Sequence, residues 1–269
     1  MGTSNTPGFL ISAMWVSIFS FKEMIRRRRL LVMSIVMLIP PMMVLLWRFF
    51  DPGISATSLL DSLMSIIYVH FMVAIVSLAF GLSAIGEIVD DGTVVYYWTR
   101  PMRREAIYLG RLFSAQIVSS VLLVISIVIC FLVMTIGNSS VLSMEMVKLY
   151  VSACVVLLVG SMAYTAIFAA VGTVLKKPML PALIFAFWWE SISSHAPMKL
   201  QELTVACHLR NLLSEPSAES SKGGISWLEG FLKPADPPSN TESFLVIMAV
   251  IASTTIIGAV LMNRKEIFK

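Results

Sequence analysis

Six long runs of apolar residues restrict this chain to folds that form inside a membrane. Each run is long enough, or nearly so, to cross ~30 Å of hydrocarbon as a helix that rises about 1.5 Å per residue. Only 13% of the 269 residues are charged, whereas a soluble domain carries roughly a quarter. The runs cover residues 30–50, 62–85, 112–136, 147–171, 179–192 and 243–262, of which the fifth is the shortest.

The length of these runs favours helices over strands. Lipid offers no partners for backbone N–H and C=O groups, so a spanning segment is either a helix or part of a closed barrel. Barrel strands alternate apolar and polar residues over roughly ten positions, and the runs here stay apolar for about twenty. We therefore expect an all-α polytopic membrane protein whose six transmembrane helices form a single membrane domain over residues 1–269.

The basic residues predict how the chain is oriented. The clusters at 26–29, 100–111, 176–177 and 264–269, together with Lys22, hold fourteen of the 20 Lys and Arg residues. The short loops at 51–61 and 137–146 hold none. By the positive-inside rule the clusters are cytoplasmic, and so are both termini. We expect a multi-pass protein of the cell (plasma) membrane, with residues 193–242 as its long extracytoplasmic segment. We expect membrane lipid as a binding partner and no nucleic acid.

Residues 8–29 have the pattern of an amphipathic helix that lies in the membrane interface. Apolar side chains recur at helical spacing, and polar ones such as Ser12 and Glu23 fall off that stripe, before four arginines follow. The alternative is a cytoplasmic extension of the first span. The stripe consists of Ile11, Met14, Trp15, Ile18, Phe21 and Ile25.

Several residues inside the spans stand out. Pro40-Pro41 removes two backbone donors, which predicts a kink in the first span. Small residues spaced by four in the fourth span allow close helix packing, which we expect within one subunit rather than at a dimer seam; they are Ser161, Thr165 and Ala169.

Two ionisable residues are candidates for a transport pathway. His70 lies well inside the second span, where an ionisable group is a functional candidate. The simpler reading, which we favour, is a neutral histidine that is hydrogen-bonded to a neighbouring helix. Glu190 follows Trp188-Trp189 near the outer end of the fifth span, and it either faces the pathway or simply reaches the outer water.

A charged segment, residues 86–111, separates the second and third spans. Its acidic residues and Gly92-Thr93 suit the start and cap of a short helix, and its arginines form a cationic edge. Aromatic and arginine anchors are typical of protein interfaces. The alternatives are an aromatic belt at residues 96–98 and arginines that bind anionic lipid.

The sequence lacks the common motifs of membrane enzymes. It has no G-x-x-x-x-G-K-[ST], H-E-x-x-H, C-x-x-C or G-x-S-x-G. The three histidines, His70, His195 and His208, do not cluster in sequence. We expect neither catalytic residues nor a metal site, and no nucleotide site of the chain's own.

The residues of the charged segment follow a definite order: Glu87, Gly92-Thr93, Pro101 with Arg103 and Arg104, and Gly110-Arg111 entering the third span. The predicted interfacial helix precedes six spans, with this segment after the second and a longer outer segment before the sixth. This motif and this order of elements resemble those of the type-2 permease subunits of ATP-binding-cassette transporters. The family's motif is a Glu, Gly-Thr, a Pro followed by Arg, and Gly-Lys entering the third span, so Arg111 stands here in place of Lys.

The resemblance implies a mechanism in which this chain has no cofactor. Two permease chains, expected to be a homodimer, pair above two ATPase subunits that bind ATP and Mg. A coupling helix in the charged loop sits in a cleft of the ATPase, and most members of the family export. The residues to which the resemblance gives this coupling role are Glu87, Asp90, Asp91, Gly92, Thr93, Arg100, Pro101, Arg103 and Arg104.

Other classes of function remain open to the sequence. A secondary transporter driven by an ion gradient needs buried ionisable groups and usually repeated halves, and here His70 is the clear intramembrane candidate. A membrane anchor or assembly factor for another complex is a further alternative.

Overall fold

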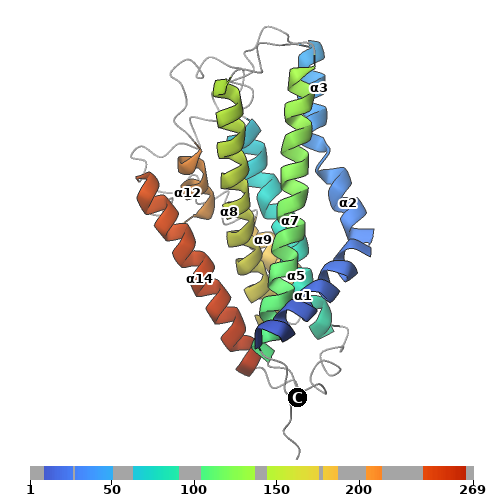
Figure 1. Ribbon diagram of the computed structural model, residues 1–269, viewed down its shortest axis with the longest axis vertical. Helices are drawn as coiled ribbons and strands as arrows, with labels where there is room; N and C mark the ends of the chain where they lie inside the picture. Colours follow the sequence, from blue (N-terminus) through green and yellow to red (C-terminus); the bar gives the residue numbers. More distant parts are fainter. Residues whose placement is uncertain are drawn as a thin grey trace, which may run out of the picture.

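The structure, a computed structural model, is a bundle of helices (Figure 1). It describes residues 9–26, 28–50, 63–90, 104–136, 144–175, 178–186, 204–213 and 239–264. Within these ranges the chain forms helices and turns, and no strand occurs. In chain order the helices are α1 (Phe9–Arg26), α2 (Arg28–Val36), α3 (Ile39–Phe50), the π-helix η1 (Leu63–Met72), α5 (Val73–Asp90), α7 (Arg104–Thr135), α8 (Met144–Val174), α9 (Met179–Ile184), α12 (Val205–Leu212) and α14 (Asn240–Arg264).

Five helical stretches in the described part of the chain are long and apolar enough to cross a membrane. They are Arg28–Trp47, Leu63–Gly86, Arg104–Thr135, Val147–Val174 and Asn240–Arg264. These stretches confirm the predicted all-α, multi-pass architecture. The predicted fifth span, 179–192, begins with α9, and its residues 187–192 lie outside the described residues.

The helices on either side of the charged segment extend further than the sequence predicts. The second span continues through α5 to Asp90, and the third begins with α7 at Arg104 rather than at residue 112. In the sequence, charged residues mark the predicted ends of the spans. The structure buries one of these residues, Arg111, which is hydrogen-bonded within the bundle. The described helices therefore end at Asp90 and begin again at Arg104, both inside the predicted segment 86–111.

Helices α5, α7 and α8 form the centre of the bundle, and small residues let them approach closely. A Cβ added at Gly81 of α5 would lie 3.0 Å from both the carbonyl oxygen of Thr165 and the Cβ of Phe168 on α8. Ser161, Thr165 and Ala169 are fully buried there. The Ser120 hydroxyl of α7 lies 2.7 Å from that of Ser161. The prediction that these small residues pack within one subunit is confirmed.

Helix α1 lies obliquely across the foot of the bundle, against α7 (Figure 1). Its small and polar face packs inward, with Ser12, Val16 and Ser20 buried. Most of the predicted apolar stripe faces outward; its exposed members are Ile11, Met14, Trp15, Ile18 and Ile25. A water-soluble bundle buries the apolar face of such a helix, so this reversed arrangement suits a helix whose outer face meets lipid.

The first span is interrupted at Met37–Leu38, between α2 and α3. The chain changes direction there (Figure 1). Because Pro40 and Pro41 occupy the first turn of α3 directly after the break, the interruption confirms the predicted kink.

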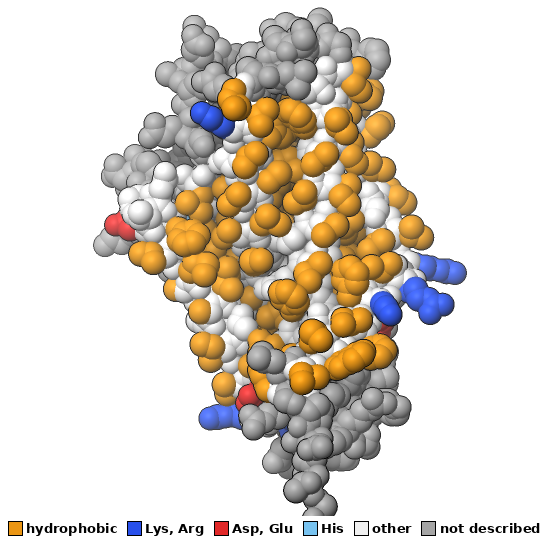
Figure 2. Space-filling view, in the orientation of Figure 1, with side chains coloured by type: hydrophobic (Ala, Val, Ile, Leu, Met, Phe, Trp, Pro, Cys, Tyr) orange, Lys and Arg blue, Asp and Glu red, His pale blue; other side chains and the backbone are white. Residues whose placement is uncertain are grey.

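Apolar side chains cover the sides of the bundle, and charged ones gather at its ends (Figure 2). In a soluble protein an apolar surface of this extent would drive association. Most of the described cations lie toward the α1 end of the bundle, on α1, near the starts of α2 and α7 and at the end of α14; they are Lys22, Arg26, Arg28, Arg29, Arg104, Arg111 and Arg264.

Candidate functional site

The two described helix ends that flank the charged segment, the end of α5 and the start of α7, lie at the same end of the bundle as α1 (Figure 1). Glu87 and Asp90 belong to the last turn of α5, although their side chains lie outside the described part. Arg104 is the first residue of α7. The other predicted coupling residues lie outside the described residues; they are Asp91, Gly92, Thr93, Arg100, Pro101 and Arg103.

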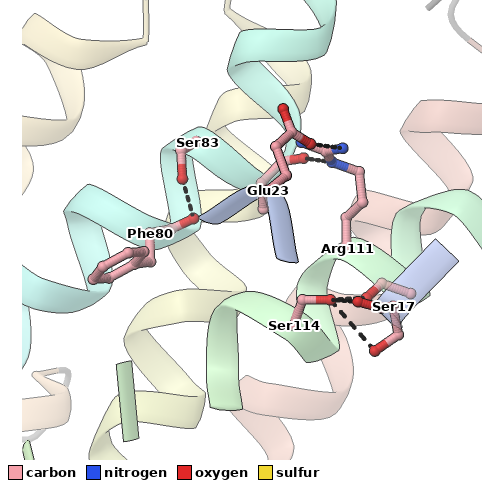
Figure 3. Close-up of polar contacts among 8 residues, drawn as sticks. Ser17, Glu23, Phe80, Ser83, Arg111 and Ser114 are labelled. Carbon is pink, nitrogen blue, oxygen red and sulfur yellow. Dashed lines mark hydrogen bonds and ion pairs between the residues drawn. The ribbon is translucent and has the colours of Figure 1, made fainter. Parts of the chain in front are cut away.

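Arg111 joins the three helices at the base of this segment. Its side chain is 2% exposed, although it carries a full charge. Its Nε donates to the carbonyl oxygen of Ala84 on α5, and its NH1 lies 3.2 Å from Oε2 of Glu23 on α1. Figure 3 shows the Arg111 guanidinium beside the Glu23 carboxylate. A buried cation needs such partners because desolvation is costly, so α1 and α5 are both held to α7.

Ser114 makes a second connection between α7 and α1, one helical turn further along. Its hydroxyl lies 2.8 Å from the carbonyl oxygen of Ser17 and 3.3 Å from the Ser17 hydroxyl (Figure 3). The same oxygen lies 2.8 Å from the carbonyl of Gly110 in its own helix. This small polar side chain therefore bonds α1 without holding the helices apart.

Gly110 allows the two helix backbones to touch. A Cβ at this position would lie 2.6 Å from the carbonyl oxygen of Ala13 and 3.0 Å from Cβ of Val16. Contacts below about 3 Å are too close for carbon and oxygen atoms, so only glycine fits without a shift of α1. The Gly110-Arg111 pair thus acts as one unit, in which glycine permits the approach and arginine fixes it.

The start of α7 also holds the end of α14. Arg104 NH1 donates to the carbonyl oxygen of Asn263 at 3.3 Å. In return Asn263 Nδ2 donates to Oε1 of Glu105 at 3.4 Å. Nearby, the buried Tyr108 ring fills the space above Gly258 of α14. The base of the bundle therefore links α1, α5, α7 and α14 around the two ends of the charged segment.

The two candidate pathway residues are not brought together by the described structure. His70 lies in η1, half-buried, with its ring edge-on to Phe71 at a centroid distance of 5.2 Å. Glu190 lies outside the described residues. The two readings of His70 and Glu190 therefore stay predictions.

Sequence reasoning missed the partner of Arg111 and the anchor of α1. In the sequence Glu23 is a polar residue off the apolar stripe, and Arg111 is a member of a basic cluster and a motif position; neither pattern pairs the two. A signal was present, because an acid in an interfacial helix and an arginine at the edge of an apolar run both need a partner near lipid. The pairing itself spans 88 residues, which no local pattern reveals.

The described contacts at the base of the bundle hold α1 together with the stretches Leu63–Gly86, Arg104–Thr135 and Asn240–Arg264, which are long and apolar enough to cross a membrane. Comparisons with known proteins do not add a family to this description: no protein-family model matches the chain, and no curated protein matches it either.

Proposed function

We propose that this chain is the permease subunit of an ATP-binding-cassette transporter, and that it exports its substrate. ATP hydrolysis by a separate ATPase subunit would drive the movement. The observation that best supports this is the junction of Arg111 with Glu23 and Ala84, because it links α1, α5 and α7 at the base of the charged segment. A force applied to residues 91–103 would reach all three helices.

The proposal includes six spans with both termini in the cytoplasm of a cell whose plasma membrane holds the protein. The distribution of described cations supports this orientation, because most of them lie at the α1 end. The span that the five described ones lack is the predicted fifth, 179–192, which residues 187–192 would complete after α9. Two copies of the chain would pair, and two ATPase subunits with ATP and Mg would dock against residues 87–104.

Purification from the native membrane in mild detergent tests this proposal. The chain expressed alone should show no ATP hydrolysis, and the native assembly should hydrolyse ATP. Glu87→Gln, or Arg103→Gln with Arg104→Gln, should leave hydrolysis in place and reduce transport. Lys148→Gln is a matched control, since this exposed cation lies at the opposite end of the bundle. Equal transport in all three variants would count against the role of the segment.

An ion-gradient transporter is the second candidate, and one observation favours it. His70 lies in a π-helix, a rare element that often marks functional sites. In this case His70→Gln should abolish uptake or export, and an ionophore should stop it while ATP remains present. If ionophores leave transport unchanged and depletion of ATP stops it, the permease proposal is favoured. A chain that serves only as an anchor or assembly factor would show neither dependence.

A further inference from the structure

Pro40 and Pro41 remove the helical donors of two backbone carbonyls, those of Val36 and Met37, and of these two residues Met37 is the buried one. In a continuous helix the N–H of residue 41 would donate to the carbonyl of Met37, four residues earlier. Pro41 has no N–H. Met37 is buried, and the surroundings of this span are apolar, so water is not at hand to replace the missing donor.

Ser126 of α7 supplies that donor from another helix. Its hydroxyl donates to the Met37 carbonyl oxygen at 2.7 Å. Both residues are buried, and 89 positions of sequence separate them. Hydroxyl side chains of neighbouring helices are known to satisfy backbone groups that proline frees in a membrane. The break in the first span is therefore completed by α7.

Tyr68 of η1 fixes the direction of the Ser126 hydroxyl. The Tyr68 hydroxyl lies 2.8 Å from Ser126 Oγ and 3.1 Å from Cys130 Sγ. Ser126 has one hydroxyl hydrogen, which points at Met37, so Tyr68 is the donor when it bonds Ser126. Three spans thus meet in one chain of hydrogen bonds, from Tyr68 through Ser126 to Met37.

We propose that Ser126 is a positioning residue that replaces the amide missing at Pro41 and sets the direction of α3. While the bond is made, α3 is held against α7. When it is broken, α2 and α3 turn relative to each other about Met37–Leu38. Tyr68 keeps Ser126 in the rotamer that makes the bond. This inference concerns the hinge of the first span and does not depend on what the protein transports.

A cycle of substitutions at Ser126 and Pro41 tests the inference in the full chain, reconstituted in lipid nanodiscs. Ser126→Ala should lower the apparent Tm by about 3–6 °C and should raise amide hydrogen exchange in peptides from residues 31–47. Ser126→Thr keeps the hydroxyl and should retain most of the protection. In a Pro41→Ala background the restored N–H can bond Met37, so Ser126→Ala should then change Tm and exchange by less than half as much.

Two controls separate the hinge from general packing. Pro40→Ala restores a donor for Val36 rather than for Met37, so the full effect of Ser126→Ala should persist in that background. Ser120→Ala removes another interhelical hydroxyl bond of α7 without raising exchange at residues 31–47. Tyr68→Phe should raise exchange there, but less than Ser126→Ala.

The inference is overturned if Ser126→Ala has the same effect with Pro41 and with alanine at position 41. It is equally overturned if Ser126→Ala leaves exchange at residues 31–47 unchanged. Should Ser126→Ala not fold, the Tyr68→Phe variant decides the matter by the same exchange measurement, with unchanged exchange as the contrary result.

Discussion

Arg111 and Glu23 form an ion pair of unequal exposure, with the arginine side chain 2% and the glutamate side chain 37% exposed. Their atoms NH1 and Oε2 lie 3.2 Å apart. The pair attaches the interfacial helix to a membrane span, and its buried member is the cation. Replacement of Glu23 and replacement of Arg111 should therefore change the stability of the protein by different amounts.

Glu23→Ala should destabilise the protein more than Arg111→Met. The first leaves a buried cation with a backbone carbonyl as its remaining described partner, a loss of about 2–3 kcal/mol after allowance for the partial exposure of Glu23. The second removes the charge and fills the space with an apolar side chain, which is often close to neutral. Thermal unfolding in detergent measures both, and the double variant should match Arg111→Met. A larger loss for Arg111→Met would contradict this account.

Gly110→Ala should loosen α1. The new methyl group would lie 2.6 Å from the Ala13 carbonyl oxygen, and backbone atoms of α1 must shift to admit it. We expect a loss of about 1–3 kcal/mol and faster proteolysis of α1. Gly172→Ala is the matched control, since its nearest atoms lie at an ordinary 3.5 Å and alanine favours helix. Equal effects of the two variants would contradict the close packing of α1.

Gly258→Ala should push α14 away from α7. A Cβ at this position would overlap both the hydroxyl oxygen and Cζ of Tyr108. Tyr108→Phe alone should be close to neutral, because the buried hydroxyl has no hydrogen-bond partner among the described residues. In combination it should rescue Gly258→Ala only in part, as the ring carbon remains too close. Apparent Tm values of the three variants check this, and full tolerance of Gly258→Ala would contradict it.

The parts of the fold that follow from periodicity were predictable from the sequence. Long apolar runs predicted the five candidate spans that the described residues contain. The spacing of Ile11, Trp15 and Ile18 predicted the amphipathic character of α1. Both features depend on neighbours within one helix. The break before Pro40 followed from the missing amides. Ser161 and Thr165 were correctly expected to pack internally.

What the sequence left open depends on contacts between distant helices. Arg111 was placed in a loop because a charge at the edge of an apolar run usually marks the end of a span. Its partners Glu23 and Ala84 bring it inside α7. In the same way, nothing near Met37 in sequence indicates that Ser126 will satisfy its carbonyl. Such pairings arise only when the helices are packed.

Sidedness is testable with two single-cysteine variants in a background whose three native cysteines are replaced by alanine. Lys22→Cys lies in α1, and Met144→Cys at the start of α8, where residue 144 is 74% exposed. By the positive-inside rule, a membrane-impermeant maleimide should label Met144→Cys in intact cells. It should label Lys22→Cys only after permeabilisation. The reverse pattern would place the charged segment outside the cell and refute docking of a cytoplasmic ATPase.

Site-specific photo-crosslinking in intact cells shows whether a separate ATPase drives this chain through residues 87–104. A photoreactive amino acid is placed at Thr93 and, as a control, at Met144. We expect Thr93 to capture a protein with a P-loop, ATP binding or vanadate to alter the yield, and Met144 to capture no such protein. Capture of no ATPase from Thr93, in a cell where the chain still supports transport, would contradict the proposed drive by an ATPase.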